Sequence, residues 1–249
     1  MATPRHLNHA PITEALIDLR VTPSTHLTAD ILRQVAESVR AQYPEMAERR
    51  GMKMSLEFNA GGPTAQSAAD LGIDGYLCRS ADKRIVVQFR ADGFTFNRLQ
   101  PYTSWRDIIP EALRLYRLYA AATKATVIRV AVRYINQIKI PDEVEDLREF
   151  LTYPPSAPLG SGQVLSTFLS RVTVYDQGTQ ASAVVMQAID PSLDPAMKAV
   201  LLDIAAFKVK PNDVSFSPDE VEPTLEVLHN MKNDVFFGSV TDEALRPYL

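Results

Sequence analysis

The sequence predicts an α+β fold built from two similar lobes, each with the order strand, helix, three or four antiparallel strands and long helix. First, residues 13–21 and 126–134 share one alternation of apolar and polar residues. Second, Ser104 and Ser217 lie the same 113 positions apart, and each precedes a helical pattern. Third, short turn-forming clusters separate the intervening strands, and such clusters are typical of hairpins that pair antiparallel.

The predicted lobes cover residues 1–124 and 125–249, and further positions support their alignment. At the same offset, Phe94 and Phe96 align with Phe207 and Val209, and Pro110 aligns with Pro223. Self-similarity of this kind indicates that one supersecondary unit occurs twice. The order of elements resembles the tandem lobes of the TATA-binding-protein type of fold, which implies a curved sheet with helices on one face. A helix-grip arrangement, in which a sheet wraps around one long helix, is the alternative.

The elements of the first lobe follow from period-two and period-3.6 patterns. Strands are expected at residues 10–21, 52–58, 75–79, 84–90 and 94–97, and helices at 28–43 and 104–124. Thr28 and Ser104 are the predicted caps of the two helices, and Pro44 ends the first one. Residues 59–69 are rich in Gly, Ala, Ser and Thr, which predicts a loop.

The second lobe repeats this plan with differences in detail. Strands are expected at residues 126–140, 164–175, 181–189 and 199–209, and helices at 143–151, 217–235 and 241–249. Ser217 and Pro218 predict a strong helix start, because a cap and a proline at the first helical position precede two acidic residues. Residues 154–162 contain three prolines and two glycines, which predicts a loop of fixed irregular shape.

The composition is that of an ordinary globular protein, with 46% hydrophobic and 22% charged residues. The single cysteine, Cys78, excludes an internal disulfide framework and suits a reducing compartment. The first residues lack the pattern of a secretory signal, and no apolar run reaches membrane length, so we expect a cytoplasmic protein. A net charge of −4 and a pI near 5.6 give no global electrostatic reason to bind nucleic acid or an anionic membrane.

Three motifs carry a family resemblance. They are Ala10-Pro11-Ile12-x-Glu14, Phe96-Asn97-Arg98-Leu99-x-Pro101-Tyr102-x-x-Trp105 and Arg133-Tyr134-Ile135-Asn136-x-Ile138. With these motifs the chain is similar, over essentially its whole length, to a sporadically distributed family of uncharacterised bacterial proteins of similar length. The resemblance implies a stand-alone bacterial protein without an assigned activity or cofactor. No functional residues carry over from the family.

The middle motif joins a strand end to a helix start, and two interpretations of it are open. Trp105, the only tryptophan, and Tyr102 make the junction aromatic, so these residues can fasten the helix to the sheet. Alternatively, Asn97 and Arg98 project at the sheet edge beside the helix N-terminus, where they could hold a carboxylate or a phosphate.

A second candidate surface follows from the arginines of the two aligned strands. Arg20 and Arg133 coincide in the alignment and lie opposite the apolar face, so with Arg129 they could line one open face of the sheet. A symmetric polar surface suits a two-fold ligand or partner, whereas Asp18 beside Arg20 equally fits ordinary charge pairs on a solvated sheet. The candidate ligand-binding residues are therefore Asn97, Arg98, Tyr102, Trp105, Arg133, Asn136 and Arg20.

The sequence contains no catalytic or metal-binding signature. The four histidines lack the spacing of metal ligands, and neither a phosphate loop nor a nucleophile elbow occurs. We therefore expect no cofactor and no metal, and the absence of a nucleophile favours a protein that is not an enzyme.

The leading functional hypothesis is a non-catalytic binding or protein-interaction module, which engages a protein partner through the polar sheet face or the exposed sheet edges. The alternative is a binder of small anionic ligands, or an enzyme, with a pocket between the sheet and the long helices that uses Arg133, Asn136, Asn97 and Arg98. A nucleic-acid-binding saddle follows only from the fold analogy, and the acidic pI opposes it. Monomer and homodimer are both compatible with the sequence.

Overall fold

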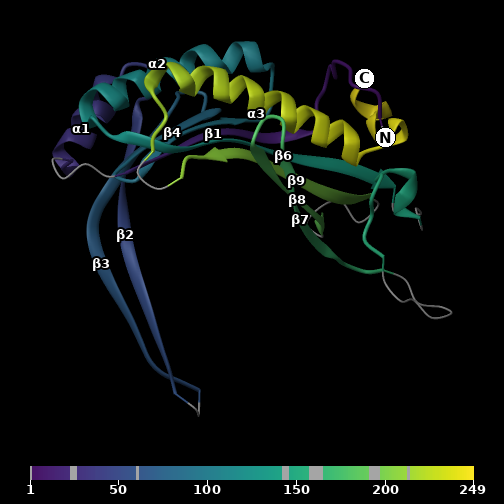
Figure 1. The fold of residues 1–249 in the computed structure, drawn as a ribbon, viewed down its shortest axis with the longest axis horizontal. Coiled ribbons are helices and arrows are strands. Elements are labelled where there is room, and N and C mark those ends of the chain that lie inside the picture. The colour runs from purple at the N-terminus through teal and green to yellow at the C-terminus, as the bar shows by residue number, and fades with distance from the viewer. Residues whose placement is uncertain are drawn as a thin grey trace. The chain divides into compact units, whose positions relative to one another are not determined.

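The computed structural model describes residues 2–22, 27–59, 62–141, 146–156, 165–190, 197–211 and 214–249. These residues form a nine-stranded antiparallel sheet and four α-helices, so the predicted α+β class is confirmed (Figure 1). Within these ranges, no helix is long and apolar enough to span a membrane.

The sheet consists of strands contributed along the whole chain. They are β1 Ile12–Thr22, β2 Glu45–Asn59, β3 Gly62–Arg79, β4 Ile85–Arg90, β5 Gly93–Leu99, β6 Thr126–Pro141, β7 Leu169–Asp176, β8 Ala181–Asp190 and β9 Met197–Val209. Their order across the sheet is β2-β3-β4-β5-β1-β6-β9-β8-β7, so β2 and β7 are the edge strands. The helices are α1 Ala29–Ser38, α2 Trp105–Thr123, α3 Pro218–Ser239 and α4 Asp242–Leu245.

The chain divides into two compact units, which are described separately below. Unit 1 comprises Met1–Asp18, Arg98–Ser104 and Ile128–Leu249, and unit 2 comprises Leu19–Asn97 and Trp105–Val127. The predicted lobe boundary between residues 124 and 125 follows the order of elements instead, and it stays a prediction.

The helices α1 and α3 begin where the sequence predicts. The Thr28 hydroxyl accepts a hydrogen bond from the N–H of Ile31 at 3.3 Å, and α1 begins at the next residue. The N–H of Ser217 donates to the Glu220 carboxylate at 2.7 Å, and α3 follows directly. The Lys210 ammonium also binds this carboxylate, and it lowers the pKa of Glu220 to about 2. Both starts satisfy backbone donors that the helix itself leaves open.

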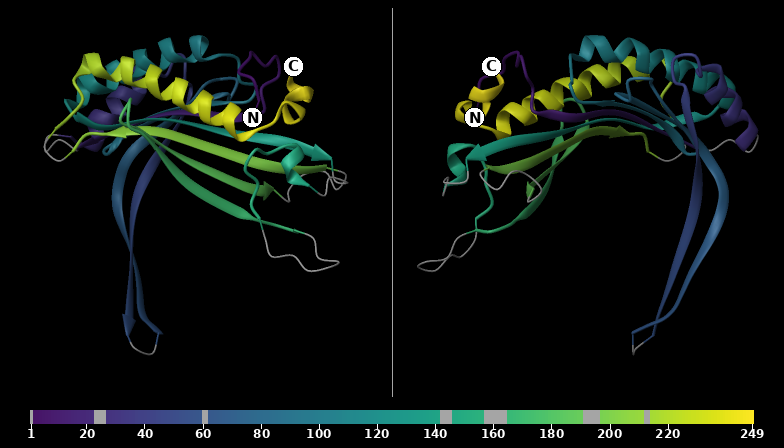
Figure 2. Two further views of the ribbon diagram at one scale, coloured as in Figure 1. Left: turned by 45° about the vertical axis from the view of Figure 1, so that its right-hand side comes forward. Right: turned by 180° about the vertical axis from the view of Figure 1, so that it is seen from behind.

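The prediction of a loop at residues 59–69 is wrong. β2 and β3 form one long hairpin whose ladder continues to the pair Asn59 and Gly62, so residues 62–69 belong to a strand. Small and polar residues are tolerated in a strand when an antiparallel neighbour satisfies the backbone groups. The described pairing of β4 with β3 covers Gly75–Arg79, and the rest of the hairpin runs on as a two-stranded ribbon (Figure 2).

A second correction concerns the helix predicted at residues 143–151. In the described part of this segment the helical element is a single 3-10 turn, Leu147–Glu149, and the Asp146 carboxylate accepts from the N–H of Arg148 at 2.9 Å. Leu147 and Leu151 have helical spacing, but Leu151 is buried and forms a β-bridge with Val240, so a contact distant in the sequence replaces a longer helix. Residues 142–145 lie outside the described residues, as does most of the loop predicted at residues 154–162.

Each unit has a core between its helices and its strands. In unit 1, α3 packs on β9 and β8 (Figure 2), and the buried apolar residues include Ile138, Val200, Leu202, Ile204, Phe236 and Phe237. In unit 2, Phe89 and Phe94 of the strands meet Tyr116 and Tyr119 of α2, with ring centroids 5.9–6.5 Å apart. Because side chains alternate along a strand, the residues between these core positions face away from the helices. We call that side of each unit its open face.

Candidate functional site

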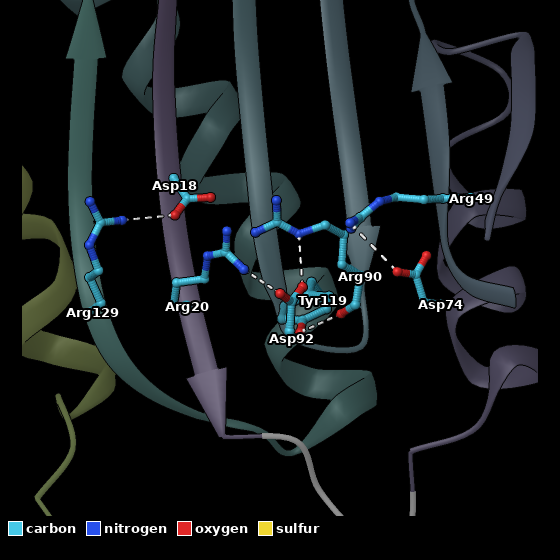
Figure 3. Close-up of polar contacts among 8 residues, drawn as sticks. All are labelled: Asp18, Arg20, Arg49, Asp74, Arg90, Asp92, Tyr119 and Arg129. Atoms are coloured by element: carbon cyan, nitrogen blue, oxygen red, sulfur yellow. Dashed lines mark hydrogen bonds and ion pairs between the residues drawn. The ribbon is translucent and has the colours of Figure 1, made fainter. Parts of the chain in front are cut away.

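The open face of unit 2 holds a carboxylate that two arginines share. Asp92 lies in the turn between β4 and β5, with Arg20 of β1 on one side and Arg90 of β4 on the other (Figure 3). Arg20 Nη1 pairs with Asp92 Oδ2, and Arg90 Nε lies 3.1 Å from Asp92 Oδ1. One carboxylate thus faces two guanidinium groups, and these three residues carry a net charge of +1.

The position of Arg90 is fixed by its neighbours on both sides of the strand. Only 7% of Arg90 is exposed, and its carbonyl oxygen accepts a hydrogen bond from the Tyr119 hydroxyl at 2.9 Å. Gly93 makes room for the guanidinium, since a Cβ at this position would lie 2.8 Å from Arg90 Nη2 and 2.3 Å from the carbonyl oxygen of Leu19. A glycine is required here because two backbones and a guanidinium approach closely.

A further charge pair lies on neighbouring strands of unit 2. Arg49 of β2 is paired with Asp74 of β3 across 3.5 Å, so the contact is loose (Figure 3). Among the described residues, Arg49 Nη1 and Asp74 Oδ1 make no hydrogen bond although both atoms are buried. With Arg20, Arg90 and Asp92, this pair brings the group to three positive and two negative charges.

Unit 1 has charge pairs of the same kind on its own open face. Arg129 of β6 binds Asp18 of β1 at 3.1 Å, and its guanidinium carbon lies 4.9 Å from the centroid of the Phe207 ring. Arg133 Nε donates to Asp203 Oδ1 at 2.8 Å, and Arg133 Nη2 donates to Asp203 Oδ2. These hydrogen bonds to Asp203 raise the pKa of Arg133. Since arginine stays charged throughout the physiological range, these arginines can bind anions but are poor general acids or bases.

The arginines predicted from the strand alternation lie where the sequence places them. Arg20, Arg129 and Arg133 all lie opposite the buried residues of their strands. Each of them is bound to an aspartate. Asp18, which follows Arg20 closely in the sequence, binds Arg129 instead.

The other predicted site residues are engaged within the fold. The Asn136 amide is buried and donates to the carbonyl oxygen of Leu202 at 2.9 Å, so it satisfies the backbone of β9. Arg98 Nη2 donates to the carbonyl oxygen of Pro101 at 3.3 Å, within its own loop.

The aromatic residues of the middle motif are packed. The Tyr102 hydroxyl lies 3.2 Å from that of Tyr134 in unit 1, whereas Trp105 is 8% exposed at the start of α2 in unit 2. Asn97 is buried in β5. The predicted motif is therefore divided between the two units, and the described contacts favour its structural interpretation.

Sequence reasoning missed a buried lysine on α3. Lys232 Nζ lies 3.7 Å from the centroid of the Tyr134 ring and donates to Asn233 Oδ1 at 2.6 Å. Burial lowers the pKa of Lys232 to about 7. Its burial could have been predicted from the sequence, since Lys232 continues the apolar stripe of Leu225 and Leu228 at helical spacing. Burial also lowers the pKa of neighbouring His229, to about 3, with a smaller contribution from the Lys232 charge.

Two aspartates of the open faces were also missed. Asp92 looks like an ordinary turn residue, and its role depends on two arginines from strands that are distant in the sequence. Asp203 interrupts the apolar run of β9, and its alternation with buried Leu202 and Ile204 was the signal that it faces the other side.

Comparisons with known proteins do not add a function to this geometry. No protein-family model matches the chain, and no curated protein matches it significantly. The described residues contain no group of three or more His, Cys, Asp and Glu side chains placed to hold a metal ion. The resemblance to the family of uncharacterised bacterial proteins stays a prediction.

Proposed function

We propose that this chain is a non-catalytic binding module whose open sheet face binds a carboxylate-bearing segment of a protein partner. The main support for this proposal is that the Asp92 carboxylate is shared by Arg20 and Arg90. An arginine fork can bind two carboxylates at once, because a guanidinium has five N–H donors in a planar arrangement. The side chain of Arg20 is 45% exposed, so a carboxylate from a partner can reach it.

A protein partner fits this surface better than a nucleic acid. The arginines of each open face alternate with aspartates, and these aspartates would repel a continuous row of phosphates. Nucleic-acid binding draws most of its affinity from uninterrupted phosphate neutralisation, and the net charge of −4 opposes it further. A protein segment can place single carboxylates against the arginines, and its hydrogen-bond donors can contact the aspartates.

The alternative function, a ligand pocket between the sheet and the long helices, has less support. Asn136, one of its predicted anchors, uses its amide for the backbone of β9. Arg133, another anchor, holds Asp203 with two hydrogen bonds on the open face. Arg133 thus lies on the open face, and the Asn136 amide on the buried face is engaged by backbone carbonyls.

We also propose that the fold arose by duplication of a lobe with the order strand, helix, three or four strands and long helix, of the TATA-binding-protein-like or helix-grip-like type. The strand order supports this proposal, because the neighbours outward from β1 are β5, β4 and β3, and those outward from β6 are β9, β8 and β7. The two long helices support it as well, since α2 and α3 begin directly after the aligned residues Ser104 and Ser217.

The binding proposal is tested with a fluorescein-labelled decaglutamate peptide, titrated with the full chain at low salt while its anisotropy is measured. The Arg20→Gln variant should bind about five- to tenfold more weakly, the expected effect of losing a charge-assisted hydrogen bond of about 1–1.4 kcal/mol. The matched control is Arg33→Gln, which removes the same charge from exposed Arg33 on α1. Equal affinities of the two variants would contradict the proposal. Tighter binding of a labelled DNA duplex than of the peptide would favour the nucleic-acid alternative.

A further inference from the structure

The edge strand β7 of unit 1 exposes apolar side chains on both of its faces. The whole strand, Leu169–Asp176, pairs with β8 on one side, and no described strand pairs with it on the other (Figure 1). Four of its eight residues are large, apolar and exposed: Leu169 at 71%, Tyr175 at 61%, Val172 at 52% and Val174 at 41%. The helix α3 packs on β9 and β8 and leaves the valines of β7 uncovered.

This edge lacks the prolines, lysines and bulges that often prevent strands from pairing between molecules, and its charged residues are Arg171 and Asp176. Natural edge strands are usually protected by prolines, lysines, bulges or very short length. β7 contains neither proline nor lysine, and its register with β8 runs through eight consecutive pairs without a bulge. An exposed, regular and apolar edge is the feature that strand addition uses.

The residues of β7 are arranged so that the strand complements itself. In a two-fold dimer with antiparallel edge strands, the open faces of both copies lie on the same side of the joined sheet, so paired residues must be an even number of positions apart. A two-fold axis at Thr173 then places Val172 opposite Val174 and Arg171 opposite Tyr175. Valine pairs, a threonine pair and an arginine on an aromatic ring are all favourable across strands.

We propose that β7 is a homodimer interface, in which β7 of a second copy of this chain adds antiparallel with its two-fold axis at Thr173. The sheet would then continue from β8 and β7 of one copy into β7 and β8 of the other. The dimer is expected to be weak, with a Kd on the order of 10 µM, because a single edge strand buries less area than a standard interface. The inference does not depend on the proposed binding function of the open face.

The first test measures the molar mass of the full chain by light scattering at concentrations from about 1 to 300 µM. The mass should rise from 27.7 kDa toward twice that value for the wild type. The Val172→Lys variant should stay at the monomer mass, because each buried lysine would face a valine in the joined sheet. Val172 is exposed, so the substitution should leave the circular dichroism spectrum unchanged. A monomeric wild type at 300 µM, or a folded variant that still dimerises, would overturn the proposal.

The second test does not depend on the stability of the dimer. Paired residues across antiparallel strands have Cα atoms about 4.5–5.5 Å apart, which lies within the range that a disulfide spans, so two copies of the Thr173→Cys variant can be linked. The native Cys78 is buried and should not react. Mild oxidation should link this variant into a dimer, whereas Val209→Cys, at an exposed position on β9, should stay monomeric. Equal linking of both variants, or of neither, would contradict the proposed pairing.

Discussion

The buried lysine of α3 gives the fold a pH dependence that can be calculated. Lys232 has an ordinary pKa of 10.5 in the unfolded chain, and burial lowers it to about 7 in the folded protein. Between these values the unfolded chain binds a proton that the folded protein does not, so the free energy of unfolding rises with pH. The slope is about half its maximum at pH 7 and reaches about 1.4 kcal/mol per pH unit above pH 8, so from pH 7 to pH 9 Lys232 should contribute about 2 kcal/mol. This contribution is lost as the pH falls back to 7.

The assay is urea unfolding of the wild type and the Lys232→Met variant between pH 6 and pH 9, followed by circular dichroism. Methionine keeps the unbranched shape and removes the charge, so the difference between the two proteins isolates the lysine. His229 has a pKa of about 3 in the folded protein and an ordinary pKa of 6.5 in the unfolded chain, so it affects stability mainly below about pH 7.5 and does so in both proteins. Lys139→Met, at an exposed position of β6, is the control and should follow the wild-type curve. Parallel curves for the wild type and Lys232→Met would refute the assignment of a neutralised, buried amine.

Further predictions concern single contacts, each measured as a change in the free energy of unfolding. Asp203→Asn should destabilise by about 1–2 kcal/mol, because Arg133 loses a charged partner but stays partly in water. Tyr119→Phe should cost about 1 kcal/mol, since it removes a hydrogen bond to the buried carbonyl of Arg90. Gly93→Ala should destabilise strongly, because its Cβ would overlap the Leu19 carbonyl oxygen, whereas Gly238→Ala, with open space around its Cβ, should stabilise α3 by about 0.5–1 kcal/mol. An unchanged free energy of unfolding for Gly93→Ala, or strong destabilisation by Gly238→Ala, would contradict the inferred space around these two glycines.

Periodicity and capping signals predicted most elements of the fold. The helix starts after Thr28 and Ser217 were predictable because short-range hydrogen bonds determine them. The extent of the β2–β3 hairpin was not predictable, because the composition of residues 62–69 is typical of a loop. These residues form a strand because an antiparallel neighbour satisfies their backbone hydrogen bonds. Strand pairing is a long-range property, and local composition carries little information about it.

The candidate site was also predictable only where local sequence patterns determine it. Alternation along β1 and β6 placed Arg20 and Arg133 on the open side of their strands. Their partners could not be predicted, because Asp92 and Asp203 come from distant parts of the chain. The exposure of the apolar residues of β7 could not be predicted either, because it depends on which strands α3 packs against.

The central claim is that the open-face arginines bind a carboxylate-bearing partner. It is tested most directly by whether the Asp92→Asn substitution raises or lowers the affinity for the decaglutamate peptide. Asp92 is paired with Arg20 and Arg90, and of the two only Arg20 is exposed, so neutralisation of Asp92 should free the Arg20 guanidinium for another anion. In the decaglutamate titration, Asp92→Asn should bind several-fold more tightly than the wild type, opposite to Arg20→Gln. Unchanged or weaker binding by a folded Asp92→Asn variant would contradict the account.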